Sequence, residues 1–259
     1  MKYLILAVVL LLSAGLQAAS TYPPVTVDVS VELVSEHAYY APGAAGTATD
    51  NEGFISNAGF VVTGEGVVVF DSLGSPSLGW ALREHIRKIT EQPVVKVVVS
   101  HYHADHIYGL QVFKDEGAEI IAPRGAYEYL DSAVSQERLE ERRLSLDPWV
   151  NDDTRLVRPD LMIEEFHQFS LGGIDFRLNY LGSAHSDGDL TMYVVQDRVL
   201  FSGDIIFEGR VPFVGDADTK RWLETLQALE TNQLHALVPG HGPAAKDPVE
   251  AVAPPREYI

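Results

Sequence analysis

The stretch "VVKVVVSHYHADHIYG", residues 94–109, joins an apolar run to a dense group of titratable side chains. The β-branched run is typical of a strand that is buried on both faces of a sheet. Histidines crowded at a buried strand end would repel one another when protonated and would lack partners when neutral. Imidazole and carboxylate groups are ligands of zinc and related metals, so the stretch predicts a metal site. The candidate ligands in it are His101, His103, Asp105 and His106.

The spacing of these residues indicates how they would share a pocket. Alternate side chains of an extended segment point the same way, so we expect His101, His103 and Asp105 to lie on one face. His106 would follow in the turn and face the other side of the pocket. A complete site needs further partners, which should come from other parts of the chain.

Further residues of the ligand type follow other apolar runs. His185 lies in "LGSAHSDGD", Asp204 in "FSGD" and His241 in "VPGHG", each at the end of a predicted strand. Sheet-based folds gather their functional loops at such ends, so we expect these three residues to join the first cluster. The other histidines lie in segments that predict surface or packing roles: His37, His85, His167 and His235.

The succession of apolar patterns predicts two similar halves, each with strands first and alternating strands and helices later. Ser75 is the expected N-cap of a helix that begins with Pro76, and the turn "TGEG" at 63–66 should join two strands. The expected strands are 25–34, two within 55–72, 93–100, 118–122, 174–182, 190–197, 198–204 and 235–242. The expected helices are 75–90, 109–117, a single long one at 125–146, and 218–232, with a loop at 147–160. Helices outside and sheets inside predict an α/β fold, a four-layer αββα sandwich of two mixed sheets.

The first residues have the layout of a secretory signal peptide. "MKYLILAVVLLLSAGLQAAS" has one lysine, an uncharged apolar run and small residues near Ala18 and Ala19. The apolar run is shorter than the roughly 20 residues that span a bilayer, although an uncleaved anchor is the alternative interpretation. We therefore expect a signal peptide at 1–19, one domain at 20–259, and a location in the periplasm or outside the cell, with no membrane anchor after cleavage.

Composition excludes several kinds of site and partner. The chain has no cysteine, which excludes disulfides and thiolate ligands or nucleophiles. Its formal net charge is −18, and loss of Lys2 with the signal peptide would make it −19. So acidic a surface disfavours nucleic acid and anionic lipid as partners. The expected partner is a small-molecule substrate, and the residues do not indicate an oligomeric state.

Taken in order, these motifs resemble the metallo-β-lactamase-fold hydrolase superfamily over essentially the whole mature chain, including "VVVFDS" with Asp71. The resemblance implies the αββα sandwich, with the site at one edge of both sheets. It also implies two metal ions, zinc in the first instance and iron as the alternative. The first ion would be held by His101, His103 and His185, and the second by Asp105, His106 and His241, with Asp204 bridging both.

The resemblance implies a hydrolase in which a hydroxide shared by two zinc ions attacks an ester, thioester, lactone or amide carbonyl. Asp105 would orient that hydroxide. Arg210 and Phe213 would line the substrate pocket, although Arg210 could equally serve a surface salt bridge. The "SGD" at Asp204 is similar to glyoxalase-II-like and lactonase-like branches, so any β-lactamase activity is expected to be weak. Several segments are most similar to the periplasmic SoxH-like group, the quinoprotein relay system zinc metallohydrolases.

Two other functions remain open at this point. A mononuclear iron oxygenase of sulfur compounds, similar to the persulfide dioxygenases, keeps a related motif but uses two histidines and one aspartate. A non-catalytic metal-binding protein of the periplasm would have less need of Asp105 and Asp204. The seven-residue set favours two metals and hydrolysis.

Overall fold

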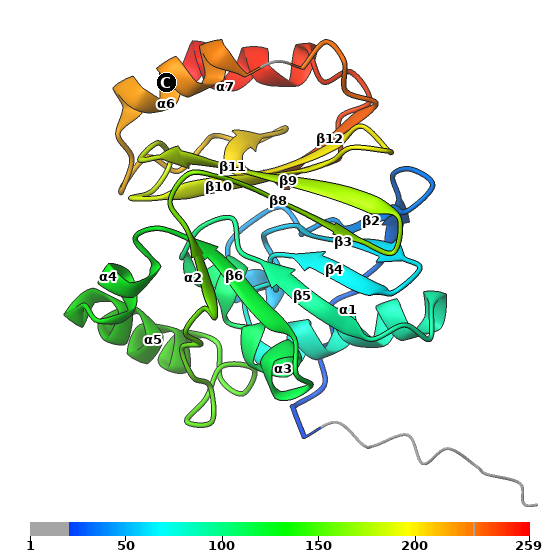
Figure 1. Ribbon diagram of the computed structural model, residues 1–259. Coiled ribbons are helices and arrows are strands. Elements are labelled where there is room, and N and C mark those ends of the chain that lie inside the picture. Colours follow the sequence, from blue (N-terminus) through cyan, green and yellow to red (C-terminus); the bar gives the residue numbers. More distant parts are fainter. Residues whose placement is uncertain (1–20, 230) are drawn as a thin grey trace, which may run out of the picture.

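Two mixed sheets lie face to face between two outer layers of helices (Figure 1). The computed structural model describes residues 21–229 and 231–259. The expected signal peptide at 1–19 therefore lies outside the described residues. The observed layers confirm the expected four-layer α/β sandwich.

The first sheet has seven strands in sequence order, antiparallel from β1 to β4 and parallel from β4 to β7. Its strands are β1 (Glu32–Leu33), β2 (Ala38–Ala41), β3 (Ala58–Thr63), β4 (Gly66–Phe70), β5 (Val94–Val98), β6 (Glu119–Pro123) and β7 (Leu161–Ile163). The helices of its half are α1 (Pro76–Ile89), α2 (Ala104–Ile107), α3 (Leu110–Asp115), α4 (Ala126–Leu130) and α5 (Ala133–Ser145). The 3₁₀ turn η1 (Thr49–Asn51) precedes β3.

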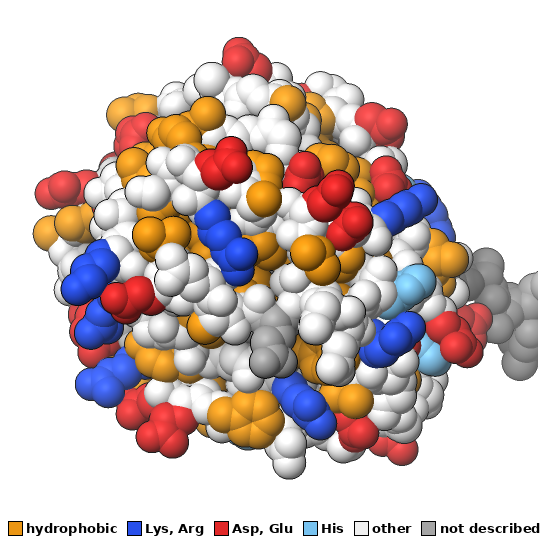
Figure 2. All heavy atoms as spheres, turned by 90° about the horizontal axis from the view of Figure 1, so that it is seen from above, with side chains coloured by type: hydrophobic (Ala, Val, Ile, Leu, Met, Phe, Trp, Pro, Cys, Tyr) orange, Lys and Arg blue, Asp and Glu red, His pale blue; other side chains and the backbone are white. Residues whose placement is uncertain are grey.

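The second sheet has five strands in the order β12-β11-β10-β9-β8, with β11 and β12 parallel and the other pairs antiparallel. They are β8 (Phe166–Leu171), β9 (Ile174–Gly182), β10 (Asp189–Val194), β11 (Val199–Phe207) and β12 (Ala236–His241). Helix α6 (Thr219–Ala228), the turn η2 (Glu250–Val252) and helix α7 (Ala253–Tyr258) follow in this half. Seen from the side of α6 and α7, hydrophobic side chains are scattered among acidic and basic ones (Figure 2).

Apolar side chains fill each interface between layers. Phe70 of the first sheet and Phe201 of the second meet with ring centroids 5.6 Å apart. On the outer side of the second sheet, the fully buried Trp222 of α6 packs with Leu200 and Leu237. Burial of each such side chain from water stabilises the fold by about 1.5–3 kcal/mol, and this burial holds the two sheets together.

Several expected elements are confirmed, and their caps explain their limits. Ser75 accepts a hydrogen bond from the backbone N–H of Leu78 and Pro76 is the first residue of α1, as the sequence predicts. The tight link at Thr63–Gly66 joins β3 and β4 in the expected antiparallel pair. These local signals were sufficient because each depends on residues that are neighbours in the chain.

Other expectations were wrong in detail. Of the predicted strand 25–34, only β1 pairs with another strand. Val29 is buried, and Val25, Val27 and Val31 are partly buried against the hydrophobic core that contains Val29. The alternating pattern therefore reflects packing of one side of the segment, without hydrogen bonds to a neighbouring strand. The predicted long helix 125–146 is broken into α4 and α5, because the side chain of Ser132 caps a new helix. The sequence interpretation also missed the strands β2, β7 and β8, the helices α2 and α7, and the turns η1 and η2.

Candidate metal centre

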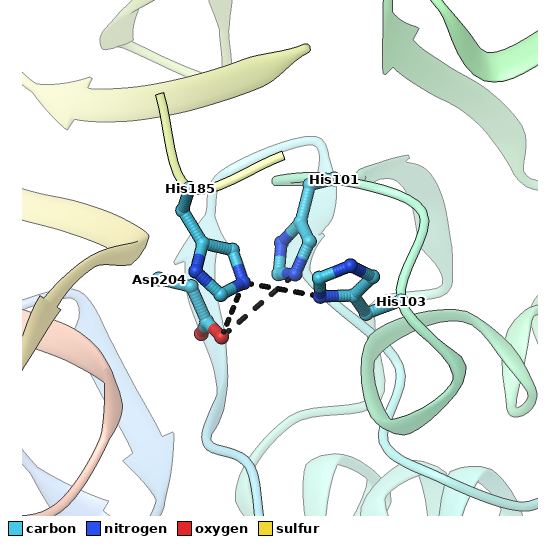
Figure 3. A group of neighbouring side chains, drawn as sticks. All are labelled: His101, His103, His185 and Asp204. Atoms are coloured by element: carbon cyan, nitrogen blue, oxygen red, sulfur yellow. Dashed lines mark hydrogen bonds and ion pairs between the residues drawn. The ribbon is translucent and has the colours of Figure 1, made fainter. Parts of the chain in front are cut away.

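The structure brings all seven predicted ligand residues to one edge of the sandwich. They form two adjoining groups whose nitrogen and oxygen atoms lie within 4.8 Å of one another in each group. One group is drawn in Figure 3, where His101 and His103 from one loop, His185 from another and Asp204 converge. The first group is His101, His103, His185 and Asp204; the second is Asp105, His106 and His241.

Asp204 lies between the two groups. Its Oδ2 is 3.2 Å from His185 Nε2, 3.8 Å from His101 Nε2 and 3.3 Å from His241 Nε2. Its Oδ1 is 3.2 Å from His106 Nε2. One carboxylate therefore contacts imidazoles of both groups, which is the position expected of a bridging ligand.

Local structure places the residues somewhat differently from the sequence expectation. His101 and His103 follow β5 in extended chain, but Asp105 and His106 lie on the short helix α2. Asp204 lies within β11 at an irregularity of its pairing with β12, and the strand continues to Phe207. The expectation that Asp105 continues the extended alternation was therefore wrong, although its carboxylate still reaches the cluster, 3.3 Å from His241 Nε2.

A buried hydrogen-bond chain fixes how His101 faces the site. Ser100 Oγ donates to Asp71 Oδ2 at 2.8 Å, so its lone pairs are free to accept the Nδ1 proton of His101 at 2.9 Å. The Nε2 atom of His101 then carries a lone pair and points into the cluster. Fixing the outer nitrogen in this way orients a metal-binding imidazole.

Three other imidazoles are also held by a hydrogen bond at the nitrogen that faces away from the centre. His106 Nδ1 lies 2.9 Å from Asp71 Oδ2, and His241 Nδ1 lies 2.7 Å from the carbonyl oxygen of Ile55. His103 is reversed: its Nε2 is 3.2 Å from Asp216 Oδ2, and its Nδ1 is 3.0 Å from His185 Nε2. His101, His103, His106 and His241 thus donate outward and present a lone pair to the centre, whereas His185 Nδ1 makes no hydrogen bond among the described residues.

Several polar atoms at the centre make no hydrogen bond among the described residues. His101 Nε2, His106 Nε2 and Asp204 Oδ1 are buried without a hydrogen bond. Burial of unpaired polar atoms costs about 1–3 kcal/mol each, and such atoms need a reason. Five imidazoles and two carboxylates form a donor set that suits zinc or iron, so the residues present fit divalent metal ions.

The charges of the cluster are strongly interdependent. Burial alone would raise the pKa of Asp204, but the surrounding histidines hold that pKa well below its ordinary value. Burial and neighbouring imidazoles lower the pKa of His101 well below its usual range. Burial would also lower the pKa of His106, but Asp204, Asp105 and Asp71 raise it well above the ordinary value. A cation in the second group therefore competes with a proton on His106.

Comparison with known proteins shows to which family the chain belongs. The family described as "Metallo-beta-lactamase superfamily" matches residues 51–241, well over half of the 259 residues. The chain belongs to the metallo-β-lactamase superfamily. This membership confirms the expected family and, at the level of the family, the expectation of a metal-dependent hydrolase.

Similar proteins within the superfamily differ in what they are named for. A "Metallo-beta-lactamase type 2" of Elizabethkingia meningoseptica is 24% identical over 238 residues, 90% of this chain and 86% of that protein. A "Linear primary-alkylsulfatase" of Pseudomonas sp. is 22% identical over 211 residues, 69% of this chain but 40% of the sulfatase. A structure of a "Metallo-beta-lactamase from Pontibacter korlensis" has a TM-score of 0.68 at 20% identity, covering 89% of this chain and 98% of that one. The structural likeness shows the shared fold.

Two glycines make room for the carboxylate of Asp204. A Cβ atom on Gly240, in "VPGHG", would lie 1.9 Å from Asp204 Oδ1. Gly203 has a φ of 52°, and a Cβ there would lie 2.5 Å from Ser100 Cβ. The glycines next to Asp204 and His241 therefore allow the two strands to bring these side chains together.

Sequence interpretation missed several residues that support the metal centre. Asp189 is buried and accepts from the backbone N–H groups of Ala184 and Ser186, which shapes the loop that carries His185. Asp71 was recognised only as part of the resemblance, and Asp216 was not singled out. Acidic residues of this kind carry no local signal, because their partners are distant in the sequence.

A cavity of about 450 Å³ opens onto the centre. Arg210 and Phe213 both line it, together with Asp105, Asp204 and His241. Arg210 Nη1 lies 3.1 Å from His241 Nδ1, and the ring of Phe213 lies 6.0 Å from that of His103. Arg210 pairs with no carboxylate among the described residues, so the structure does not support its salt-bridge alternative.

The histidines expected to lie outside the site do so. His37 contacts Asp197, with His37 Nδ1 2.8 Å from Asp197 Oδ1, and this contact ties the start of β2 to the β10–β11 turn. Neither group of metal-ligand type among the described residues includes His37, His85, His167 or His235. In the described part of the chain, the helices are too short or too polar to cross a membrane.

Proposed function

We propose that this protein is a dinuclear zinc hydrolase of ester, thioester, lactone or amide substrates. The observation that carries the proposal is the position of Asp204, whose two carboxylate oxygens face different groups of histidines. A mononuclear centre would have no need of the second group, Asp105, His106 and His241. The same observation favours hydrolysis over the iron oxygenase alternative.

The chain's own residues would divide the work of hydrolysis. His101, His103 and His185 would hold one ion, Asp105, His106 and His241 the other, and Asp204 both. Bound zinc supplies Lewis acidity, which polarises a carbonyl and lowers the pKa of water. Asp105 has a side chain that is 21% exposed, against 4% for Asp204. Its carboxylate can therefore accept a hydrogen bond from a water molecule in the cavity and orient it for attack.

The cavity wall would position the substrate. Phe213 is 55% exposed and its ring lies beside His103 and His185, so it offers an apolar surface next to the centre. Arg210 offers a positive charge in the same cavity, close to His241. These residues would hold the acyl or leaving group while the polar centre acts on the carbonyl.

Purified protein is expected to contain about two zinc ions per chain, and removal of them with a chelator should abolish hydrolysis. The reason is that five buried imidazoles and two carboxylates need cations to satisfy their lone pairs. Elemental analysis and activity before and after chelation, with zinc added back, provide the measurement. A single tightly held iron, with oxygen consumption on sulfur compounds, would instead support the oxygenase.

β-Lactam hydrolysis is expected to be slow relative to hydrolysis of a thioester or lactone. Dedicated β-lactamases of the superfamily usually lack the bridging aspartate that Asp204 resembles. A screen of thioesters, lactones and several β-lactam classes at equal enzyme concentration measures the ratio of kcat/KM values. Efficient turnover of several β-lactam classes would contradict this expectation, but it would not contradict the proposed metal centre.

The site of action proposed for the mature protein is the periplasm. The support is the sequence of residues 1–19, with cleavage after Ala18 or Ala19. N-terminal sequencing of the exported protein tests it, because a chain that still begins with Met1 would indicate an anchor. The placement in the SoxH-like group stays a prediction of the sequence motifs.

A further inference from the structure

Asp216 joins three parts of the molecule at the side of the metal centre. It lies in the segment 208–218, between β11 and α6, and its Oδ2 is 3.2 Å from His103 Nε2. The same oxygen accepts a hydrogen bond from Arg138 Nη2 of helix α5 at 2.6 Å. One carboxylate oxygen therefore connects the loop after β5, helix α5 and the segment that carries Arg210 and Phe213.

The contact to Asp216 decides which nitrogen of His103 faces the centre. A carboxylate can only accept a hydrogen bond, so His103 must carry its proton on Nε2. The Nδ1 atom then has a free lone pair, and it lies 3.0 Å from His185 Nε2 inside the first group. Hydrogen bonds from His103 and Arg138 hold the pKa of Asp216 well below its ordinary value, so the acceptor stays ionised.

The segment 208–218 is fixed at both of its ends. At its start, the backbone N–H of Glu208 donates to the carbonyl of His241. At its end, the N–H of Asp218 donates to the carbonyl of Ala184, and the Asp218 side chain caps α6. Between these ends, Asp216 contacts His103, Arg210 Nη1 lies 3.1 Å from His241 Nδ1, and Phe213 meets the rings of His103 and His185 edge-on.

Arg138 lines two cavities at this place. It lines the 450 Å³ cavity that opens onto the centre and a second cavity of about 260 Å³, which Tyr102, Tyr129 and Asp216 also line. Its side chain is 31% exposed and forms an ion pair with Asp216. The Arg138–Asp216 pair therefore joins the lining of these cavities to the support of His103.

We propose that Asp216, held by Arg138, is a positioning residue that sets the metal affinity of the His101/His103/His185 group and fastens the substrate-lining segment to it. The inference rests on the proposed dinuclear function. The physical reason is as follows: an imidazole whose proton position and ring plane are already fixed binds a metal more tightly than an imidazole that must be oriented when the metal binds. The second group, which has its own supports, should be unaffected.

The test is a zinc titration of the full chain against a chelating indicator. Asp216→Ala should weaken one of the two binding steps by about 10–100-fold and leave the other within about twofold. Asp216→Asn keeps an oxygen acceptor but loses the charge, so its effect should lie between wild type and Asp216→Ala. Arg138→Met removes the support of the carboxylate and should weaken the same step, by less than Asp216→Ala.

Asp218→Ala is the matched control. It alters the same segment and removes the α6 cap without touching His103, so the binding steps should stay near wild-type values even if the protein is less stable. Unfolding of each metal-free variant by denaturant separates loss of stability from loss of affinity. A KM that rises more than kcat falls in Asp216→Asn would indicate displacement of the lining segment.

The outcomes separate this inference from the proposed function. Wild-type protein that binds no metal in the titration would contradict the dinuclear function. Wild type with two binding steps and Asp216→Ala with the same two would overturn the positioning role alone. Equal losses in Asp216→Ala and Asp218→Ala would also overturn it, because the effect would then belong to the segment's stability and not to the contact with His103.

Discussion

Asp204→Ala is expected to lower the zinc content from about two ions per chain towards one and to reduce activity by two or more powers of ten. Its carboxylate contacts His101, His185 and His241 through Oδ2 and His106 through Oδ1. Without it, two cations would lie close together with no shared negative charge between them. The second group should lose its ion, while three histidines still hold the first.

The expected loss of activity follows from the kind of group that the substitution removes. Deleting a preorganised charge partner typically costs about 3 kcal/mol of transition-state stabilisation, about a hundredfold in rate. Asp105→Ala should lower the rate more than it lowers the stability of the fold, because Asp105 is partly exposed on the short helix α2. Elemental analysis and kcat/KM on one substrate measure both variants.

His85→Ala is the control for this comparison. His85 lies on α1, remote from both ligand groups, so metal content and activity should stay near wild-type values. Full occupancy by two ions together with near-normal activity in Asp204→Ala would show that this carboxylate is not a bridge. The second group would then have to be assigned afresh.

The sequence was most informative about residues that follow strands. Most of the ligand-type residues lie at or near the carboxyl end of a strand, and the carboxyl ends of strands that run in the same direction, such as β9, β11 and β12, meet at one edge of a sheet. Local signals also predicted α1 correctly, since Ser75 and Pro76 are adjacent to the helix they begin. Both kinds of inference use neighbours in the chain or a general property of sheets.

The errors have a common physical cause, which is packing against distant residues. The alternating pattern at 25–34 reflects burial of one side against the hydrophobic core that contains Val29. A strand also needs a neighbouring strand to pair with, and only Glu32 and Leu33 have such a partner, in β2. Asp216 is exposed in part and stands in a loop, and nothing nearby in the sequence points to His103, 113 positions away. Supporting residues of this kind become visible only when the fold brings them to the site.

Asp71→Asn should damage both the fold and the metal centre, because Asp71 is surrounded by donors. Its Oδ1 accepts from the backbone N–H of Ser100 at 2.7 Å. Its Oδ2 accepts from Ser100 Oγ at 2.8 Å and from His106 Nδ1 at 2.9 Å. An asparagine must place its amide NH₂ group at one of these two positions, where it faces a donor and leaves at least one hydrogen bond unmade.

The loss of stability in Asp71→Asn should be large because the surroundings of residue 71 exclude water. Asp71 is 1% exposed, so an unpaired donor there cannot turn to water. Burial raises the pKa of Asp71 in spite of its partners, but a protonated carboxyl would also set a donor against donors, so the ionised form suits the three contacts. We expect the free energy of unfolding of metal-free protein to fall by about 2–4 kcal/mol.

The same substitution should weaken zinc binding at the second group. If Nδ1 of His106 loses its acceptor, the proton can move to Nε2, which is the atom that faces Asp204 and Asp105. Asp131→Asn is the matched control, because Asp131 pairs with Arg158 in an exposed contact. Loss of an exposed pair costs at most about 1 kcal/mol and should leave the zinc titration unchanged. Equal unfolding free energies and equal zinc affinities for these two variants would mean that Asp71 does not hold His106 in its metal-binding form.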